Sequence, residues 1–343
     1  MKIRSLLICI FLLFSIISNA QDIHFSFAER NPLVLNPALA GANFKKEATL
    51  NYRNQWSSLG DPITTTSLGF YSRLTKQRRN IGNTLALGLQ FVNDKSGNPS
   101  ISSNSFSFIL ADHIQISNES KIGVALSAGY AQRAIRINDG QWATQYNGTA
   151  YDPSLGSGES LETTEFRYLD LGAGIVYTFI ESGRTFSQSE TRIINVGLSA
   201  YHLNRPNNSI YDLNTDRLPV RVSAVASAER GIPGTNGAVL PGVYYHQQGS
   251  ANQLLVGALY KFRITDDTKY TGFNKPLSVS FGLFGRLKDA AIFKLMLDWD
   301  QYSFGYSFDF NTSGLNEYSS GFGANEIFLR FRMSEGGPSR FSR

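Results

Sequence analysis

The sequence has 343 residues, of which 42% are hydrophobic, 13% aromatic and 17% charged, a composition that excludes an intrinsically disordered chain. Its mean hydropathy of -0.18 excludes a bundle of membrane-spanning helices but agrees with strands that alternate polar and apolar residues. The net charge is +5; because Lys2 and Arg4 lie in a predicted leader, the mature chain is near +3 (5 minus 2), which gives no support to nucleic-acid binding.

Residues 1–20 are predicted to be a signal peptide that is removed on export. A basic start precedes an apolar run from Leu6 to Ile17, and Ser18-Asn19-Ala20 is a small-x-small cleavage site. The run is too short to span a membrane as a helix. The only cysteine, Cys9, lies within this leader, so the mature chain has no disulfide and no thiolate metal site. An exported membrane protein without a spanning helix must close into a barrel.

Residues 21–47 do not alternate in polarity, and Pro32 and Pro37 interrupt any helix or strand there. Apolar side chains such as Phe25, Phe27 and Leu33 favour an ordered segment over a disordered leader to the barrel. We predict either a plug in the lumen of a barrel or a contact in the periplasm.

Residues 48–333 have the pattern of strands of about ten residues separated by polar turns. Phe293 and Leu295 fall on one face of a strand, for example, and Lys294 and Met296 on the other. A soluble sandwich would alternate as well, but charged, glycine-rich polar faces and aromatic strand ends such as Trp299 favour a membrane barrel. The predicted strands are 48–56, 64–74, 84–93, 103–113, 121–132, 168–180, 192–203, 218–229, 238–247, 253–262, 276–287, 290–300, 303–310 and 325–333. The predicted fold is therefore all-β, a transmembrane antiparallel outer-membrane β-barrel of about 14 strands, followed by a C-terminal tail at 334–343.

An even strand number returns both ends of the barrel to the periplasm. With that orientation the longest connection, 133–167, is extracellular, as are those at 204–217 and 311–324. Connections on the periplasmic side are mostly shorter, although 263–275 is long. The 133–167 connection carries several aromatic residues and acids, which fit a surface that contacts the exported partner and fit equally well a solvated loop that merely caps the barrel.

No catalytic or metal site is predicted. No H-E-x-x-H, Walker or G-x-S-x-G motif is present. Asp298 and Asp300 resemble a carboxylate pair, but we interpret them as lumen acids balanced by Lys294 and Arg286. The histidines are scattered over the leading segment and three strands: His24, His113, His202 and His246. We therefore expect a protein that is not an enzyme and that uses no cofactor.

Short motifs in a fixed order resemble those of the PorP/SprF family. The resemblance covers essentially the whole mature chain, from Gln21 to about Met333. The motifs are a "QD-x-x-FS" start at Gln21–Ser26, an "NPA-x-AG" segment at Asn36–Gly41, an "R-x-QW" strand at Arg53–Trp56, an "HL-x-x-P" segment at His202–Pro206, a "GYSYD" strand at Gly305–Asp309 with Phe308 in place of Tyr, and an "HEI" strand at Asn325–Ile327 with Asn in place of His.

The resemblance implies an outer-membrane component of type IX secretion or gliding machinery, surrounded by outer-membrane lipid, that anchors or assists the export of a surface adhesin. The implied partners are the C-terminal domain of that secreted adhesin and either the periplasmic secretion ring or a peptidoglycan-binding lipoprotein. The barrel alone leaves open a different function, that of a passive uptake channel for small molecules, hydrophobic ones included. The predicted partner-binding residues are Asn36, Pro37, Gly41, Arg53, Trp56, Trp142, Tyr146 and Tyr151.

Overall fold

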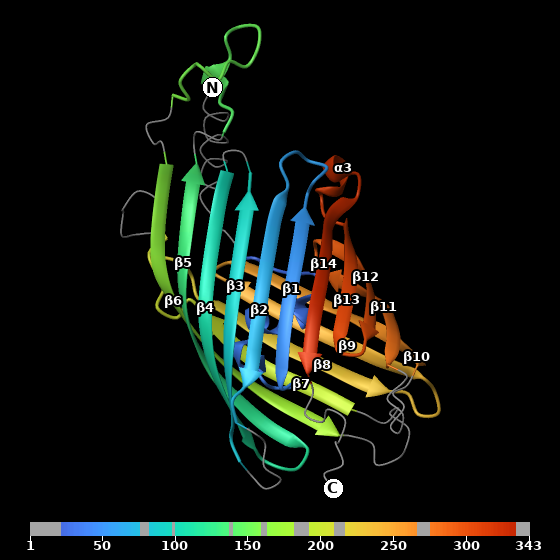
Figure 1. The fold of residues 1–343 in the computed structure, drawn as a ribbon. Coiled ribbons are helices and arrows are strands. Elements are labelled where there is room, and N and C mark those ends of the chain that lie inside the picture. Colours follow the sequence, from blue (N-terminus) through green and yellow to red (C-terminus); the bar gives the residue numbers. More distant parts are fainter. Residues whose placement is uncertain are drawn as a thin grey trace, which may run out of the picture.

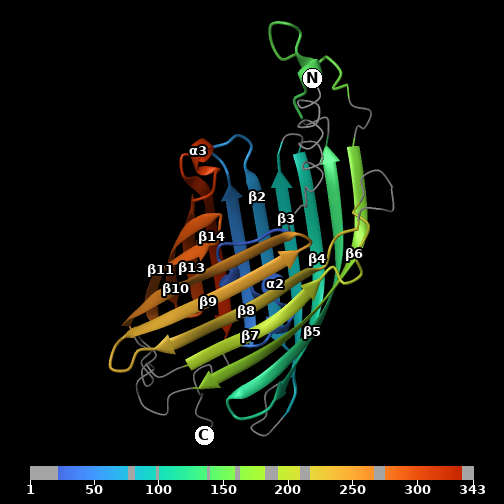
Figure 2. The same ribbon diagram turned by 180° about the vertical axis from the view of Figure 1, so that it is seen from behind.

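The fold is a closed barrel of fourteen antiparallel strands, in which each strand pairs with its neighbours in sequence and β14 closes against β1 (Figures 1 and 2). The computed structural model describes residues 22–75, 82–97, 100–136, 140–158, 163–181, 192–208, 217–265 and 275–333. The strands are β1 (Lys46–Gln55), β2 (Ile63–Arg73), β3 (Thr84–Ser96), β4 (Ser100–Gln115), β5 (Ser120–Arg136), β6 (Thr163–Glu181), β7 (Arg192–Tyr201), β8 (Arg221–Gly231), β9 (Gly237–Gln248), β10 (Ala251–Thr265), β11 (Leu277–Arg286), β12 (Ala290–Trp299), β13 (Tyr302–Asn311) and β14 (Phe322–Met333). The predicted all-β barrel and its strand number are confirmed. The predicted signal peptide and C-terminal tail lie outside the described residues.

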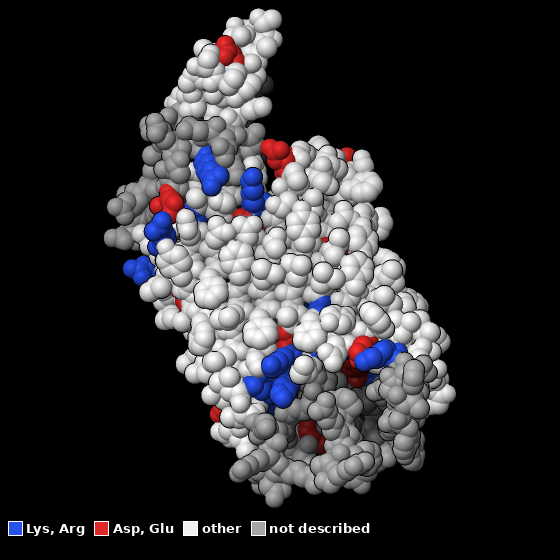
Figure 3. Space-filling view, viewed as in Figure 1, with Lys and Arg blue, Asp and Glu red and all other residues white. Residues whose placement is uncertain are grey.

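Period-two alternation gives the barrel its two faces. On β12, Lys294 and Met296 are almost wholly buried, whereas their neighbours Phe293 and Leu295 are exposed on the outer wall. The same pattern recurs around the wall, and charged side chains are sparse over the strands and gather towards their ends in the view of Figure 3. An apolar band with charged rims is the surface that a lipid bilayer requires of a spanning barrel. Among the helices that the structure describes, none is long and apolar enough to cross a membrane.

The two ends of the barrel differ in their connections. The β5–β6 connection projects far beyond the strands at the end where the β1–β2 and β13–β14 connections also lie (Figure 1). Outer-membrane barrels carry their longer loops outside the cell, so this end is extracellular. The other end, where β1 begins and β14 ends, is periplasmic, in agreement with the predicted orientation.

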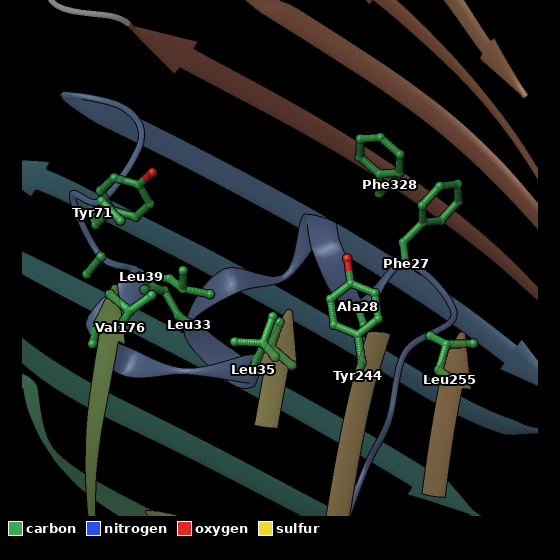
Figure 4. Packing of buried hydrophobic residues seen from close by; sticks show 14 of the residues in the cluster. Phe27, Ala28, Leu33, Leu35, Leu39, Tyr71, Val176, Tyr244, Leu255 and Phe328 are labelled. Carbon is green, nitrogen blue, oxygen red and sulfur yellow. The ribbon is translucent and has the colours of Figure 1, made fainter. Parts of the chain in front are cut away.

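The interior of the barrel is largely filled by the chain's own N-terminal residues 22–45, here called the lumen segment, which leave a cavity of about 150 Å³ against the wall from β3 to β6. Its short helices are η1 (Ala28–Arg30), α2 (Pro32–Leu35) and η2 (Pro37–Leu39). Phe27 packs edge-on against Phe328 of β14, with ring centroids 4.6 Å apart, and Leu33 and Leu35 lie in the same buried cluster as Tyr244 of β9 (Figure 4). The hydrophobic core of this protein therefore lies between a coiled segment and the inner wall, rather than between two sheets.

Candidate functional site: the lumen segment and the β5–β6 loop

The lumen segment crosses the whole length of the barrel. Asp22 contacts His202, directly after β7, and Gln248, the last residue of β9, and both of these lie at the extracellular end. At the other end, the backbone N–H of Lys45 donates to the carbonyl of Met333, the last residue of β14. The first strand begins and the last strand ends on the periplasmic side, as predicted. Asp22, the first described residue, lies at the extracellular end.

Asp22 is held at the extracellular mouth by a group of charged side chains. Its Oδ2 lies 2.6 Å from Nε2 of His202, whose Nδ1 lies 2.8 Å from Oδ1 of Asp170 on β6. Nη1 of Arg221 lies 3.2 Å from the same Asp22 oxygen. Burial alone would raise the pKa of Asp22, but Arg221 and His202 outweigh burial and hold it well below its usual range. We call this group the mouth clamp.

Protonation of His202 is expected to control the mouth clamp. Burial lowers the pKa of His202, but hydrogen bonds to Asp170 and Asp22 outweigh burial and raise it from 6.5 to about 9. Because the folded pKa is the higher one, the stabilisation is fully present below about pH 6.5 and is lost as the pH rises through about 9. Asp22 acts in the opposite sense, since its contribution is lost only as the pH falls through its lowered pKa.

An NMR titration of the His202 ring should therefore show a midpoint near pH 9, which moves down towards 6.5 in Asp170→Asn because one charged acceptor is removed. A wild-type midpoint already near 6.5 would show that Asp22 and Asp170 do not stabilise the protonated ring of His202.

A second group of polar side chains holds the lumen segment at Ser26, still in the extracellular half of the barrel. The hydroxyl of Ser26 donates to Asp309 of β13 at 2.7 Å, and its backbone N–H donates to Glu326 of β14 at 2.6 Å. Arg286 of β11 and Arg53 of β1 lie 2.9 Å and 3.3 Å from Asp309. All of these groups are buried, and buried charges are tolerated only when they are paired and hydrogen-bonded. The pairing therefore fixes the position of the segment relative to four strands.

Further ion pairs extend this network along the lumen. Nζ of Lys294 lies 2.9 Å from Glu29 of η1 and 3.5 Å from the ring centroid of Phe284. Asp298 lies 3.2 Å from Arg330. The prediction that Lys294 and Arg286 balance Asp298 and Asp300 was therefore wrong. Lys294 pairs with Glu29 of the lumen segment and Arg286 with Asp309. Asp300 pairs with Lys275.

Asn36 joins the lumen segment to the backbone of the wall. Its Nδ2 donates to the carbonyls of Ile175 on β6 and Leu198 on β7, at 3.0 Å and 3.1 Å, while its Oδ1 accepts from the N–H of Ala38. A Cβ on Gly174 would overlap the Asn36 side chain and touch Pro37. The glycine on β6 thus allows the close approach that these hydrogen bonds require.

The turn at residues 40–42 fixes the segment near the periplasmic end. Its carbonyl groups accept hydrogen bonds from side chains of the wall. Nε of Arg73 donates to the carbonyl of Gly41 at 2.7 Å, Nε2 of His113 lies 2.7 Å from the carbonyl of Ala40, and Nζ of Lys121 donates to the carbonyl of Ala42. Each carbonyl that the turn leaves without a backbone partner is satisfied by the barrel.

The predicted partner-binding residues fall in separate places. Four are buried in or against the lumen segment and are engaged by contacts within the chain: Asn36, Pro37, Gly41 and Arg53. Trp56 follows β1 at the extracellular end with a φ of 59°. The other three lie in the β5–β6 loop: Trp142, Tyr146 and Tyr151. Trp56 and Trp142 are half-buried and Tyr146 and Tyr151 are exposed, so these four residues lie where a partner outside the cell can reach them, and their role in binding stays a prediction.

The described part of the β5–β6 loop, residues 140–158, is folded on itself. Gln145, at the end of η4 (Ala143–Gln145), is buried; its Oε1 accepts from the N–H of Trp142, and its Nε2 donates to the carbonyl of Leu155. Tyr146 and Tyr151 form an isolated β-bridge and are 59% and 44% exposed. Internal hydrogen bonds thus hold two aromatic rings out towards the medium.

The sequence analysis missed most of the residues that hold the lumen segment, although they stand inside the motifs. Asp22, His202, Asp309 and Glu326 belong to four motifs far apart in the sequence, and the structure joins them in pairs through the segment. The sequence did show polar residues at the lumen-facing positions of these motifs. Period two places such residues in the lumen but does not say which of them meet.

The motifs whose residues meet at the lumen segment lie within the region that a protein-family model matches. The family model described as "Type IX secretion system membrane protein PorP/SprF" matches residues 17–331. The chain belongs to the PorP/SprF family. It is thus a membrane protein of type IX secretion, and its closed barrel with an apolar outer wall places it in the outer membrane.

Solved structures with a similar overall architecture are also outer-membrane barrels. A FadL homologue from Pseudomonas aeruginosa has 8% sequence identity and a TM-score of 0.46, with 87% of this chain and 92% of that chain covered. BamA from Haemophilus ducreyi lacking POTRA domains 1-3 has 8% identity and a TM-score of 0.42, with 84% and 70% covered. These distant likenesses concern the fold and do not transfer a function. No curated protein matches the chain.

The PorP/SprF membership and the barrel indicate a structural component of a secretion system rather than a known class of enzyme. Within the described ranges, no group of three or more His, Cys, Asp or Glu side chains is placed to hold a metal ion. The Asp22–His202–Asp170 arrangement has the look of a catalytic group but contains no nucleophile, since its two acids both accept from the imidazole.

Proposed function

We propose that this protein is a non-catalytic platform of the type IX secretion machinery that anchors a secreted surface adhesin, or assists its export, at the extracellular end of the barrel. The observation that carries the proposal is the combination of a filled lumen and a preformed loop. Ion pairs from Glu29 and Asp22 hold the lumen segment in place, and the β5–β6 loop, which carries the exposed Tyr146 and Tyr151, projects beyond the strands.

The contact surface is assigned to the loop because rigid, exposed aromatic residues give much contact area at little cost in entropy. The proposed partner is a secreted protein that carries a type IX C-terminal domain. On the periplasmic side, the proposed partners are the secretion ring or a peptidoglycan-binding lipoprotein. The competing function of a passive uptake channel gains no support from a lumen whose residues 25–42 are mostly buried.

The proposal is tested by pulling down the tagged protein from outer membranes in mild detergent and identifying the recovered proteins by mass spectrometry. We expect the wild type to recover a large secreted protein with a type IX C-terminal domain. The double variant Tyr146→Ala/Tyr151→Ala should recover it with a loss of roughly tenfold or more, because aromatic hot spots dominate such interfaces.

The matched control is Tyr318→Ala, which removes a ring that is 76% exposed on the β13–β14 connection at the same end of the barrel. This variant should recover the partner as the wild type does. Equal recovery by the loop variant would remove the loop from the interface, and a wild-type barrel without any partner would contradict the platform function itself.

A further inference from the structure

The outer wall has a hollow at the seam where β1 closes against β14. It encloses about 630 Å³ and is lined mainly by apolar side chains of β1 to β4 and β12 to β14. The register explains it: Ala48 of β1 lies between Phe70 on β2 and Phe331 on β14, so that a methyl group separates two rings. Leu50 continues the same outward row of β1. The result is a groove along β1 with aromatic walls.

A positive charge stands at the periplasmic end of this groove. Lys46 precedes Ala48 by two residues and lies on the same outward face of β1, and its side chain is exposed. Its register partners are Ser72 and Met333, and among the described residues it forms no ion pair. Figure 3 shows Lys and Arg side chains gathered where β1 begins and β14 ends. Trp299 and Tyr302, which also line the groove, supply the amphipathic rings typical of the membrane interface.

We propose that this groove binds one glycerophospholipid of the periplasmic leaflet, with an acyl chain along Ala48 and Leu50 and the phosphate on the ammonium group of Lys46. The step from Lys46 to Leu50 spans about 13 Å of strand, which an extended acyl chain follows readily. Cationic side chains beside an apolar groove recognise anionic lipid head groups. Because the charge lies at the end opposite the long loops, the ligand belongs to the leaflet that contains phospholipid rather than lipopolysaccharide.

A second groove on the outer wall serves as an internal comparison. It encloses about 470 Å³ and is lined by residues of β5 to β9, Ile175, Val196 and Ala224 among them, with no Lys or Arg in its lining. Its surface is as apolar as that of the seam groove, and Arg192 and Arg230 stand at its periplasmic end as register partners on the outward rows of β7 and β8. Arg192 is paired with Glu181 at 3.6 Å, whereas Lys46 has no acid partner among the described residues. The second groove is therefore expected to hold a phosphate more weakly than the seam groove.

The proposal is tested by native mass spectrometry of the delipidated full-length protein in detergent, titrated with dipalmitoyl phosphatidylglycerol. The wild type should retain one lipid per barrel. Lys46→Gln should weaken retention about fivefold, Lys46→Arg should preserve it, and Ala48→Phe should abolish it because the ring fills the groove. Ala224→Phe, which fills the comparison groove, should change nothing.

The outcome that overturns the proposal is annular lipid only, that is, a broad series of adducts with the same distribution in the wild type, Lys46→Gln and Ala224→Phe. Heat-dependent electrophoretic mobility shows first that each variant is folded. Since Lys46 is an exposed side chain, Lys46→Gln keeps the test decisive even if Ala48→Phe does not fold.

Discussion

Deletion of residues 22–42 is expected to turn a closed barrel into a conducting one. These residues fill the lumen between the mouth clamp and the periplasmic end, and their side chains occupy the space against the inner wall. A barrel of fourteen strands without this filling has room for a narrow pore. Single-channel recording in planar bilayers should show no stable current for the wild type and stepwise openings for the deletion.

The matched control removes a segment of similar length from outside the lumen. Deletion of residues 140–158 takes away the β5–β6 loop and should leave the barrel closed. The lumen deletion leaves Lys294 without Glu29, and the lysine is stabilised only as far as water enters the opened lumen. The conductance test therefore also uses the deletion combined with Lys294→Met. A wild-type barrel that conducts as well as either deletion would refute the sealing role of the segment.

The strands could be predicted from the sequence because period two is a local property. Each predicted strand overlaps an observed one, since residues such as Leu295 and Lys294 alternate whatever lies across the lumen. The sign of the alternation also follows, because the apolar row must face lipid when no partner sheet is present. The strands are thus encoded locally, and their even number lets β14 pair antiparallel with β1 when the barrel closes.

The path of the lumen segment could not be predicted because its contacts are long-range. Ser26 meets Asp309 and Glu326, which are 283 and 300 residues away in sequence, and Asp22 meets His202 across 180 residues. No periodicity relates such pairs. The motifs marked these residues as important without saying that they bind one another, and Asn36 and Gly41 were therefore interpreted as contacts for a partner.

The loop shows the same limit on a smaller scale. Its aromatic composition predicted a contact surface, but its fold depends on the amide of Gln145, which bonds to the backbone at Trp142 and Leu155. A single glutamine among many polar loop residues carries no signal of that role. The composition of the loop predicts a contact surface, but it does not predict which aromatic rings the loop exposes.

Gly41→Ala is expected to destabilise the folded barrel by about 2–5 kcal/mol. Gly41 has a φ of +75°, which costs a residue with a Cβ about 1–2 kcal/mol. The added Cβ would also lie 2.7 Å from the Cβ of Ala86 on β3 and 3.2 Å from Cγ of Arg73. Overpacking of this kind costs about 1–3 kcal/mol, and here the nearest atom belongs to a rigid strand. Urea unfolding in lipid vesicles measures the loss.

Gly234→Ala separates the two causes, because Gly234 has nearly the same φ, +72°, but nothing within 4 Å of its added Cβ. It should lose only the backbone cost of about 1–2 kcal/mol. The difference between the two variants then measures how tightly the turn at 40–42 is pressed against β3. If Gly41→Ala also weakens the protection of residues 22–27 from hydrogen exchange at the far mouth, the lumen segment behaves as one unit. Equal losses in the two variants would mean that the turn has room to move, and that the ion pairs alone hold the segment in place.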